Sequence, residues 1–145
     1  MSKLSGPTVP VPTAVEIAAL RPELERGLRN LGLDPTSPVE RVIPTDKDDG
    51  TLAGALLAYL ALLVRWNSTY NLTAIRDPGE MLIKHLFDSL VLQAHVRGLP
   101  TLADLGTGPG LPGIPLALVT PGLAVTLVES NGKKTRFLRE VVRQL

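Results

Sequence analysis

The pattern of hydrophobic and polar positions predicts a helical first part of the chain and a second part of alternating strands and helices. From Ala14 to about Asn30, leucine and isoleucine recur at helical spacing with charged residues between them. Pro22 lies inside this pattern, so it predicts either two short helices or one kinked helix. Gly32 is a residue type that commonly follows the end of a helix, and we expect the pattern to end there.

A second helix is predicted from Thr51, a residue suited to capping, to about Tyr70. Its first part, residues 52–64, is almost wholly apolar, which raises the question of a membrane span. The run is too short to cross a bilayer, contains Gly54 and is followed by Arg65. It therefore predicts a buried helix.

A third helix start follows in the sequence DPGE at residues 77–80. An aspartate suited to the N-cap precedes a proline in the first helical position and a glutamate in the third. We expect this helix to reach about Val96, before the helix-stopping sequence GLP at residues 98–100. Residues 34–50, with three prolines and mixed charges, are expected to form a loop, and residues 1–13 a mobile tail.

After Pro100 the period of the hydrophobic pattern changes. Short strands are predicted at residues 101–105 and 124–129, and helices at residues 112–119 and from 132 to the end, the last capped by Ser130 or Asn131. Strand, helix, strand and helix in this order predict two adjacent parallel strands with a right-handed crossover. The fold class is therefore α/β, with a helical part at residues 14–98 and a sheet part from residue 99 onward.

The last helical pattern runs to Leu145 without a glycine or proline to end it. Two parallel strands are too few for an independently stable sheet, which needs roughly three or more. We therefore expect this chain to be the N-terminal part of a longer α/β protein.

Composition narrows the classes of function. Fifteen Lys and Arg residues against 14 Asp and Glu leave no overall basic charge, so any nucleic-acid surface would be a local patch. The chain has no cysteine, which excludes disulfides, thiolate zinc sites and cysteine nucleophiles and fits the cytoplasm. The N-terminus lacks a signal-peptide pattern, and the two histidines lack partners at metal-ligand spacing, so neither a membrane nor a metal is expected.

The main candidate site is the sequence DLGTGPGLPG at residues 104–113, between the first predicted strand and the next helix. It contains a G-x-G-x-x-G pattern, which alone is a weak indication of dinucleotide binding. Pro109 and Pro112 remove N–H donors that a pyrophosphate needs, and Asp104 would repel a phosphate. The turn instead favours a positively charged nucleoside cofactor without phosphates, with Glu129 at the next strand end accepting from ribose hydroxyls. The alternative is a tight structural turn with a solvated Glu129.

Three blocks of sequence, in order, closely resemble the ribosomal RNA small subunit methyltransferase G family, also called glucose-inhibited division protein B. The first two are RWNSTYNLT at residues 65–73 and EMLIKHLFDSL at residues 80–90. The third is the turn at residues 104–113, followed by LVES at residues 127–130 and KKTRFL at residues 133–138. The resemblance runs from about Leu52 to Leu145. It implies a helical cap followed by the first βαβα part of a Rossmann-like class I methyltransferase sheet.

The resemblance also implies a function. Members of the family use S-adenosyl-L-methionine to methylate N7 of a guanine in 16S rRNA of the 30S subunit, and we expect a cytoplasmic monomer. By the same resemblance, the residues that bind the cofactor are Gly106, Leu111, Asp104, Thr107, Gly108 and Glu129. Guanine N7 carries a free lone pair and needs no general base, so no catalytic triad is expected.

Three smaller groups of residues leave two interpretations open. His85, Asp88 and Ser89 share a helix face and are either helpers near the cofactor or a hydrogen-bonded core cluster. Trp66 either stacks on a base or, as we favour, fills the interface between the helices and the sheet. The last helix carries basic residues that form either an RNA-contacting or a merely solvated face: Lys133, Lys134, Arg136, Arg139 and Arg143.

Two alternative functions come from other classes. A nicotinamide-dependent (NAD) oxidoreductase is favoured only by the literal glycine pattern. A non-catalytic RNA-binding fragment is the other alternative.

Overall fold

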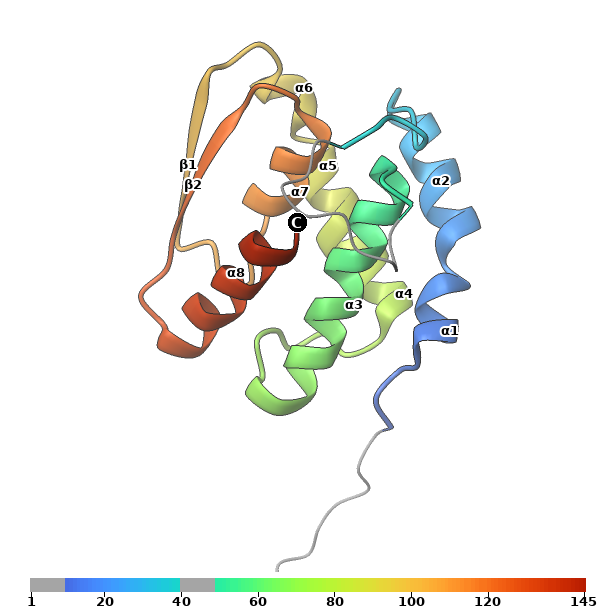
Figure 1. The fold of residues 1–145 in the computed structure, drawn as a ribbon, viewed down its shortest axis with the longest axis vertical. Helices are drawn as coiled ribbons and strands as arrows, with labels where there is room; N and C mark the ends of the chain where they lie inside the picture. Colours follow the sequence, from blue (N-terminus) through green and yellow to red (C-terminus); the bar gives the residue numbers. More distant parts are fainter. Residues whose placement is uncertain (1–9, 40–48) are drawn as a thin grey trace, which may run out of the picture.

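The computed structural model describes residues 10–39 and 49–145, which form layers from a small sheet to an outer helical layer (Figure 1). The sheet consists of β1 (Thr101–Leu105) and β2 (Ala124–Val128). Helix α7 (Gly113–Val119) packs against both strands, and α8 (Gly132–Gln144) lies beside it. Helix α3 (Leu52–Tyr70) contacts α7 and α8, and α1 (Ala14–Ala18) and α2 (Arg21–Asn30) pack on its other side.

The first helical pattern forms two short helices, which confirms one of the two predicted alternatives. Thr13 caps α1, and Glu16 completes a reciprocal capping box with it. Pro22 lies in the first turn of α2, where its missing N–H breaks no helical hydrogen bond. Gly32 follows the end of α2 with a φ of 75°, a backbone conformation that favours glycine.

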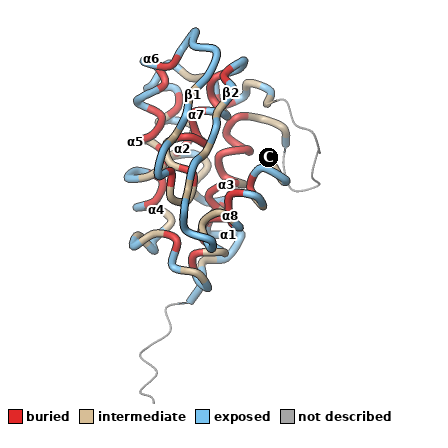
Figure 2. Tube along the Cα trace, turned by 90° about the vertical axis from the view of Figure 1, so that its left-hand side faces the viewer, coloured by how far each residue is buried: buried red, intermediate tan, exposed pale blue. Residues whose placement is uncertain are grey.

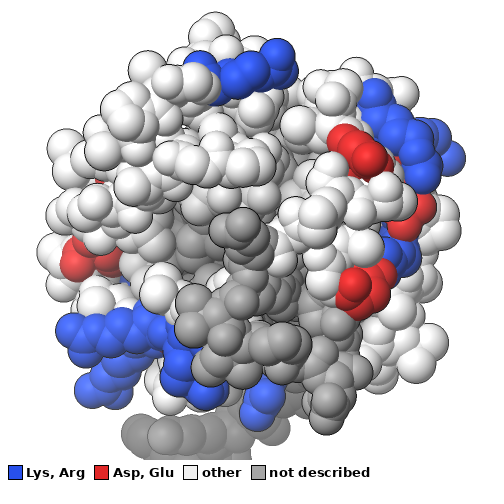
Figure 3. Space-filling model, turned by 45° about the horizontal axis from the view of Figure 1, so that its top comes forward, with Lys and Arg blue, Asp and Glu red and all other residues white. Residues whose placement is uncertain are grey.

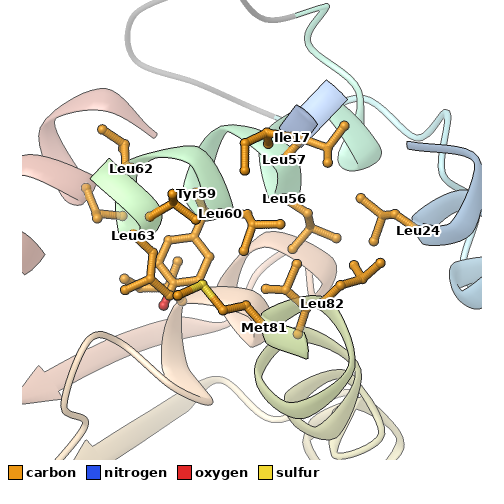
Figure 4. Close-up of a cluster of buried hydrophobic side chains, with 14 of the residues drawn as sticks. Ile17, Leu24, Leu56, Leu57, Tyr59, Leu60, Leu62, Leu63, Met81 and Leu82 are labelled. Atoms are coloured by element: carbon orange, nitrogen blue, oxygen red, sulfur yellow. The ribbon is translucent and has the colours of Figure 1, made fainter. Parts of the chain in front are cut away.

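Helix α3 forms as predicted and is the central element of the core. The Thr51 side chain caps it by accepting from the Gly54 N–H at 3.1 Å, and Asn71 ends it in the left-handed conformation. Among the described residues it is the one helix long and apolar enough to cross a membrane by length and composition. Most of its 19 residues are buried against other elements, and Figure 4 shows its leucines packed with side chains of the neighbouring helices. Its apolarity is that of a core helix.

The third predicted helix has the expected extent but is not continuous. Asp77 caps α4 (Pro78–Met81) by accepting from the Glu80 N–H, as the DPGE sequence predicts. The chain then widens into a π-helical turn, η1 (Leu82–Phe87), and continues as α5 (Asp88–Leu90) and α6 (Gln93–Val96) with a turn between them. The prediction of one regular helix was therefore wrong, because η1 inserts an i to i+5 turn that changes which residues share a face.

The two strands pair in parallel, as predicted, with Thr101 opposite Ala124 and Leu105 opposite Val128. Both carboxyl ends therefore meet at the same edge of the sheet. Helix α7 begins one residue later than expected, and β2 ends one residue earlier, so Glu129 lies just beyond the strand. Of the two proposed caps, Asn131 is the one that caps α8, by accepting from the N–H groups of Lys133 and Lys134.

The sheet is covered on one face only within the part of the chain that is described. Exposed and partly buried residues alternate along both strands, and Figure 2 views them from the exposed side. Leu105 and Val128 lie on this outer face with exposed fractions of 75% and 46%.

One hydrophobic cluster joins both parts of the chain, since it extends from Ile17 in α1 to Val141 in α8. The division at residues 98 and 99 stays a prediction. Residues 10–13 lie in no helix or strand, which fits the expected tail, and residues 1–9 of that tail lie outside the described residues. Residues 40–48 of the expected loop also lie outside them.

Truncation of a fully buried α3 side chain is expected to destabilise the fold. The Leu60→Ala change should lower the free energy of unfolding by about 2–5 kcal/mol, because the side chain is 0% exposed and its removal leaves a cavity. Urea denaturation followed by circular dichroism measures this change. The matched Leu105→Ala change should alter it by less than about 0.5 kcal/mol. Equal effects at both positions would contradict the assignment of α3 as the core helix.

Candidate cofactor site

The candidate site lies at the carboxyl edge of the sheet, where the turn at residues 106–112 connects β1 to α7. Two backbone N–H groups of the turn donate to β2: Gly106 and Thr107 both donate to the Val128 carbonyl oxygen, at 2.8 and 3.1 Å. The turn therefore starts as an extension of the parallel pair. It then reverses direction through glycines with positive φ, among them Gly110 at 100°.

Gly113, at the start of α7, must be a glycine for a steric reason. A Cβ added there would lie 2.4 Å from Leu127 Cδ2 and 2.8 Å from Asp104 Oδ2. The start of α7 therefore approaches both strands more closely than a side chain would allow. This close approach brings the Gly113 N–H within hydrogen-bond distance of the end of β1.

Asp104 uses its carboxylate to close the turn. Its Oδ2 accepts from the Gly113 N–H at 2.9 Å and from the Thr107 hydroxyl at 2.5 Å. Thr107 is 2% exposed, so its hydroxyl is buried and satisfied by this bond. The carboxylate thus joins the first and last parts of the turn and keeps a negative charge beside it.

Glu129 holds the middle of the turn from the end of β2. Its Oε2 accepts from the Gly108 N–H at 2.7 Å, and its Oε1 accepts from the Asn131 N–H at 3.1 Å. These backbone donors, Asn131 first and Gly108 second, hold the pKa of Glu129 below its usual range. The side chain is therefore ionised at neutral pH.

All available N–H groups of the turn are engaged within the protein. In addition to the donors already described, Gly110 and Leu111 donate to the Thr107 carbonyl oxygen at 3.1 and 3.0 Å. Pro109 and Pro112 have no N–H. Every N–H from Gly106 to Gly113 therefore has a protein acceptor, and a pyrophosphate would find no free backbone donor here.

The structure brings together most of the residues predicted to bind a cofactor. Asp104, Thr107, Gly108 and Glu129 are joined by the hydrogen bonds described above. Gly106 is exposed at the start of the turn, whereas the partly exposed Leu111 packs against the core. Their roles toward a cofactor stay predictions.

Sequence reasoning missed Tyr59, which contacts the turn from α3. Its hydroxyl donates to the Pro109 carbonyl oxygen at 2.8 Å across 50 residues of sequence. A tyrosine inside an otherwise apolar helical run was the signal, because a buried hydroxyl needs a hydrogen-bond partner.

The polar residues of the third helical segment do not form one group with the turn. His85 Nε2 lies 2.8 Å from the Thr73 hydroxyl oxygen, and burial lowers the pKa of His85. Asp88 is exposed and Ser89 is buried, at 5% exposure. No hydrogen bond within the described residues joins these side chains to the turn, so their role as helpers stays a prediction.

Trp66 lies at the interface between α3 and α8, as the structural interpretation of this residue predicts. Its ring centroid is 5.7 Å from that of Phe137 and 5.4 Å from that of Tyr70. Phe137 is fully buried and also contacts Tyr59. These aromatic rings connect the helical part of the chain to the helix that follows Glu129.

The basic residues of α8 are mostly exposed. Lys133, Arg136 and Arg139 are exposed and Lys134 is partly buried. Arg143 pairs with Glu140 at 2.6 Å, and hydrogen bonds from Arg143 and Gln144 lower the pKa of Glu140 to about 2.

On one face of the molecule, charged side chains are dispersed. Figure 3 shows Lys and Arg side chains in separate groups around the margin of one face, with Asp and Glu among them on the right.

Arg139 and Glu129 line a common open hollow of about 500 Å³ between β2 and α8. No group of three or more metal-ligating side chains occurs within residues 10–39 and 49–145.

The steric role of Gly113 can be tested by adding one methyl group. The Gly113→Ala change should lower the free energy of unfolding by about 1–3 kcal/mol, because the methyl group would displace Asp104 and Leu127. Gly132→Ala is the matched control, since nothing lies within 4 Å of its Cβ position. There, stability should stay the same or rise by up to about 1 kcal/mol. Thermal denaturation compares the two, and a tolerated Gly113→Ala would contradict the close approach.

Comparison with known proteins supplies the family. Residues 53–145 match the model of the family described as GidB, rRNA small subunit methyltransferase G. Proteins named ribosomal RNA small subunit methyltransferase G are also similar over most of the chain. The protein from Stenotrophomonas maltophilia strain K279a is 59% identical over 128 residues, which is 88% of this chain and 53% of that protein.

Two further relatives carry the same name. The protein from Xanthomonas euvesicatoria is 60% identical over 115 residues, or 79% of this chain and 54% of the relative. The protein from Xylella fastidiosa strain 9a5c is 73% identical over 90 residues, or 62% of this chain and 42% of the relative. The chain thus spans about half the length of the curated relatives it matches. These matches confirm the resemblance found in the sequence, and the chain belongs to the GidB family of rRNA small subunit methyltransferase G proteins.

Proposed function

We propose that this chain carries the S-adenosyl-L-methionine-binding turn of an enzyme that methylates N7 of a guanine in 16S rRNA. The observation that carries the proposal is the closed hydrogen bonding of the turn at residues 106–113. Because every N–H is engaged and two carboxylates lie beside it, the turn has no free backbone donor for a phosphate and favours a positively charged ligand. S-adenosyl-L-methionine has no phosphate and carries a positive sulfonium.

The proposed binding residues are Gly106, Leu111, Asp104, Thr107, Gly108 and Glu129. Glu129 is suited to ribose, because a carboxylate has about four lone-pair sites and the structure uses one on each oxygen. The remaining sites can accept from the two ribose hydroxyls without breaking the bond to Gly108. Asp104 supplies negative charge near the turn and keeps its shape.

The reaction requires little from protein side chains besides orientation. When bound, S-adenosyl-L-methionine supplies an electrophilic methyl group on sulfur. Guanine N7 already holds a lone pair, so no residue has to remove a proton before attack. The turn and Glu129 would fix the donor in position, and proximity and orientation would account for much of the rate.

We also propose that Lys133, Lys134, Arg136 and Arg139 contact the RNA backbone. The first three lie in the first half of α8, near the positive end of the helix dipole, where basic side chains do not stabilise the helix. Helix stability therefore gives no reason for basic residues there, whereas phosphate binding does. Their helix begins three residues after Glu129, so the RNA would lie beside the cofactor.

In this proposal the partner is the 30S subunit, and the protein acts as a cytoplasmic monomer. The NAD-dependent alternative lacks support from the turn, because no N–H is left for the pyrophosphate. A non-catalytic RNA-binding role would share the basic face of α8 but would not require Glu129.

The cofactor assignment is tested by calorimetric titration of this chain. We expect S-adenosyl-L-methionine to bind and NADH not to bind. Glu129→Gln should raise the Kd for S-adenosyl-L-methionine about tenfold, because charge-assisted hydrogen bonds become neutral ones. Glu140→Gln, which removes a paired surface carboxylate on α8, should leave the Kd unchanged. Binding of NADH with no binding of S-adenosyl-L-methionine would favour the oxidoreductase.

Methyl transfer to 30S particles, with the Stenotrophomonas maltophilia relative as reference, separates the enzyme from the RNA-binding alternative.

The RNA face is tested by charge reversal. The double change Arg136→Glu and Arg139→Glu should weaken 16S rRNA binding and reduce the slope of log K against log salt by about two or more. Filter binding at several salt concentrations measures both quantities. The control reverses Arg26 and Arg29, which are exposed on α2 across α3 from α8, and should have a much smaller effect. Equal effects of the two double changes would remove the case for an RNA face on α8.

A further inference from the structure

The hydroxyl of Tyr59 forms a hydrogen bond between the helical part of the chain and the candidate cofactor turn. Tyr59 lies in the middle of α3, and its side chain is 0% exposed. Its hydroxyl oxygen lies 2.8 Å from the Pro109 carbonyl oxygen. Figure 4 shows the tyrosine ring among the leucines of the core.

A buried hydroxyl in this apolar surrounding needs its partner. Without the Pro109 carbonyl, its desolvation would destabilise the fold relative to a phenylalanine of nearly the same shape. Burial, together with the negative charge of Asp104, raises the pKa of Tyr59, so the hydroxyl keeps its proton and remains a donor. The packing of α3 alone therefore gives no reason for tyrosine at this position.

The position of Pro109 in the turn explains what the contact does. Pro109 lies between Gly108 and Gly110, two residues with positive φ and wide conformational freedom. Because Pro109 has no N–H, it cannot donate a hydrogen bond to either carboxylate, whereas Gly108 donates to Glu129 and Gly113 donates to Asp104. The peptide group after Pro109 is fixed at its N–H end by the Thr107 carbonyl and at its C=O end by Tyr59.

We propose that Tyr59 is a positioning residue for cofactor binding. By donating to the Pro109 carbonyl oxygen, it restrains the peptide group between Pro109 and Gly110 and keeps the Gly108 N–H directed at Glu129. Glu129 is then held with its unused lone pairs available to ribose hydroxyls. This inference rests on the proposed function, since it assigns Tyr59 a role at the same site without contact with the ligand.

The test compares Tyr59→Phe with Tyr70→Phe in this chain. Each change removes one phenolic oxygen from α3, and no hydrogen bond of the Tyr70 hydroxyl occurs within the described residues. Calorimetry gives the Kd for S-adenosyl-L-methionine, and amide hydrogen exchange by NMR reports on Gly108 and Gly110. We expect Tyr59→Phe to raise the Kd about five- to tenfold, equivalent to one net hydrogen bond. Exchange at both glycines should become several-fold faster while β2 and α8 keep their protection.

The outcomes are distinguishable. A Tyr59→Phe chain that is less stable but has unchanged Kd and unchanged glycine exchange would show a purely structural hydroxyl and overturn the proposal. A wild-type chain that does not bind S-adenosyl-L-methionine would remove the proposed function instead. In that case exchange at Gly108 and Gly110 decides alone whether Tyr59 holds the turn. Tyr70→Phe should change neither the Kd nor the exchange, and equal effects of both variants would also overturn the proposal.

Discussion

The burial of α3 is the constraint on which the rest of the structure depends. A helix that is apolar around most of its circumference must be covered on several sides, and α1, α2, α4, α7 and α8 provide that cover. The helices that support the sheet and those that precede it therefore share one core. Through this core, the position of the candidate cofactor turn depends on residues about 50 positions earlier in the chain.

Aromatic contacts make the position of α8 depend on α3 as well. Phe137 lies between Tyr59 and Trp66, so α3 contacts both the turn after β1 and the helix after β2. These two segments flank the carboxyl edge of the sheet, where parallel α/β sheets bind ligands. The helical part of the chain thus acts as a support for the site and not only as a separate cap.

Local sequence signals predicted the elements that local interactions determine. Capping residues such as Thr51 and Asp77, and the alternation of apolar runs with turns, located the helices and the parallel strands to within one or two residues. The π-helical turn η1 could not be predicted, because its apolar spacing fits a regular helix equally well. The contact of Tyr59 with Pro109 depends on tertiary packing across 50 residues, which no local pattern encodes. The sequence did single out Asp104 and Glu129, although it did not show that both carboxylates bind the turn itself.

The closed hydrogen bonding of the turn has an entropic consequence. Because each N–H from Gly106 to Gly113 already has a protein acceptor, the turn does not need a ligand to order its backbone. A ligand that docks there loses its own freedom of motion but does not have to freeze a disordered loop. The cost of ordering the loop would therefore not reduce its affinity, and its arrival would rearrange little besides the side chains that touch it.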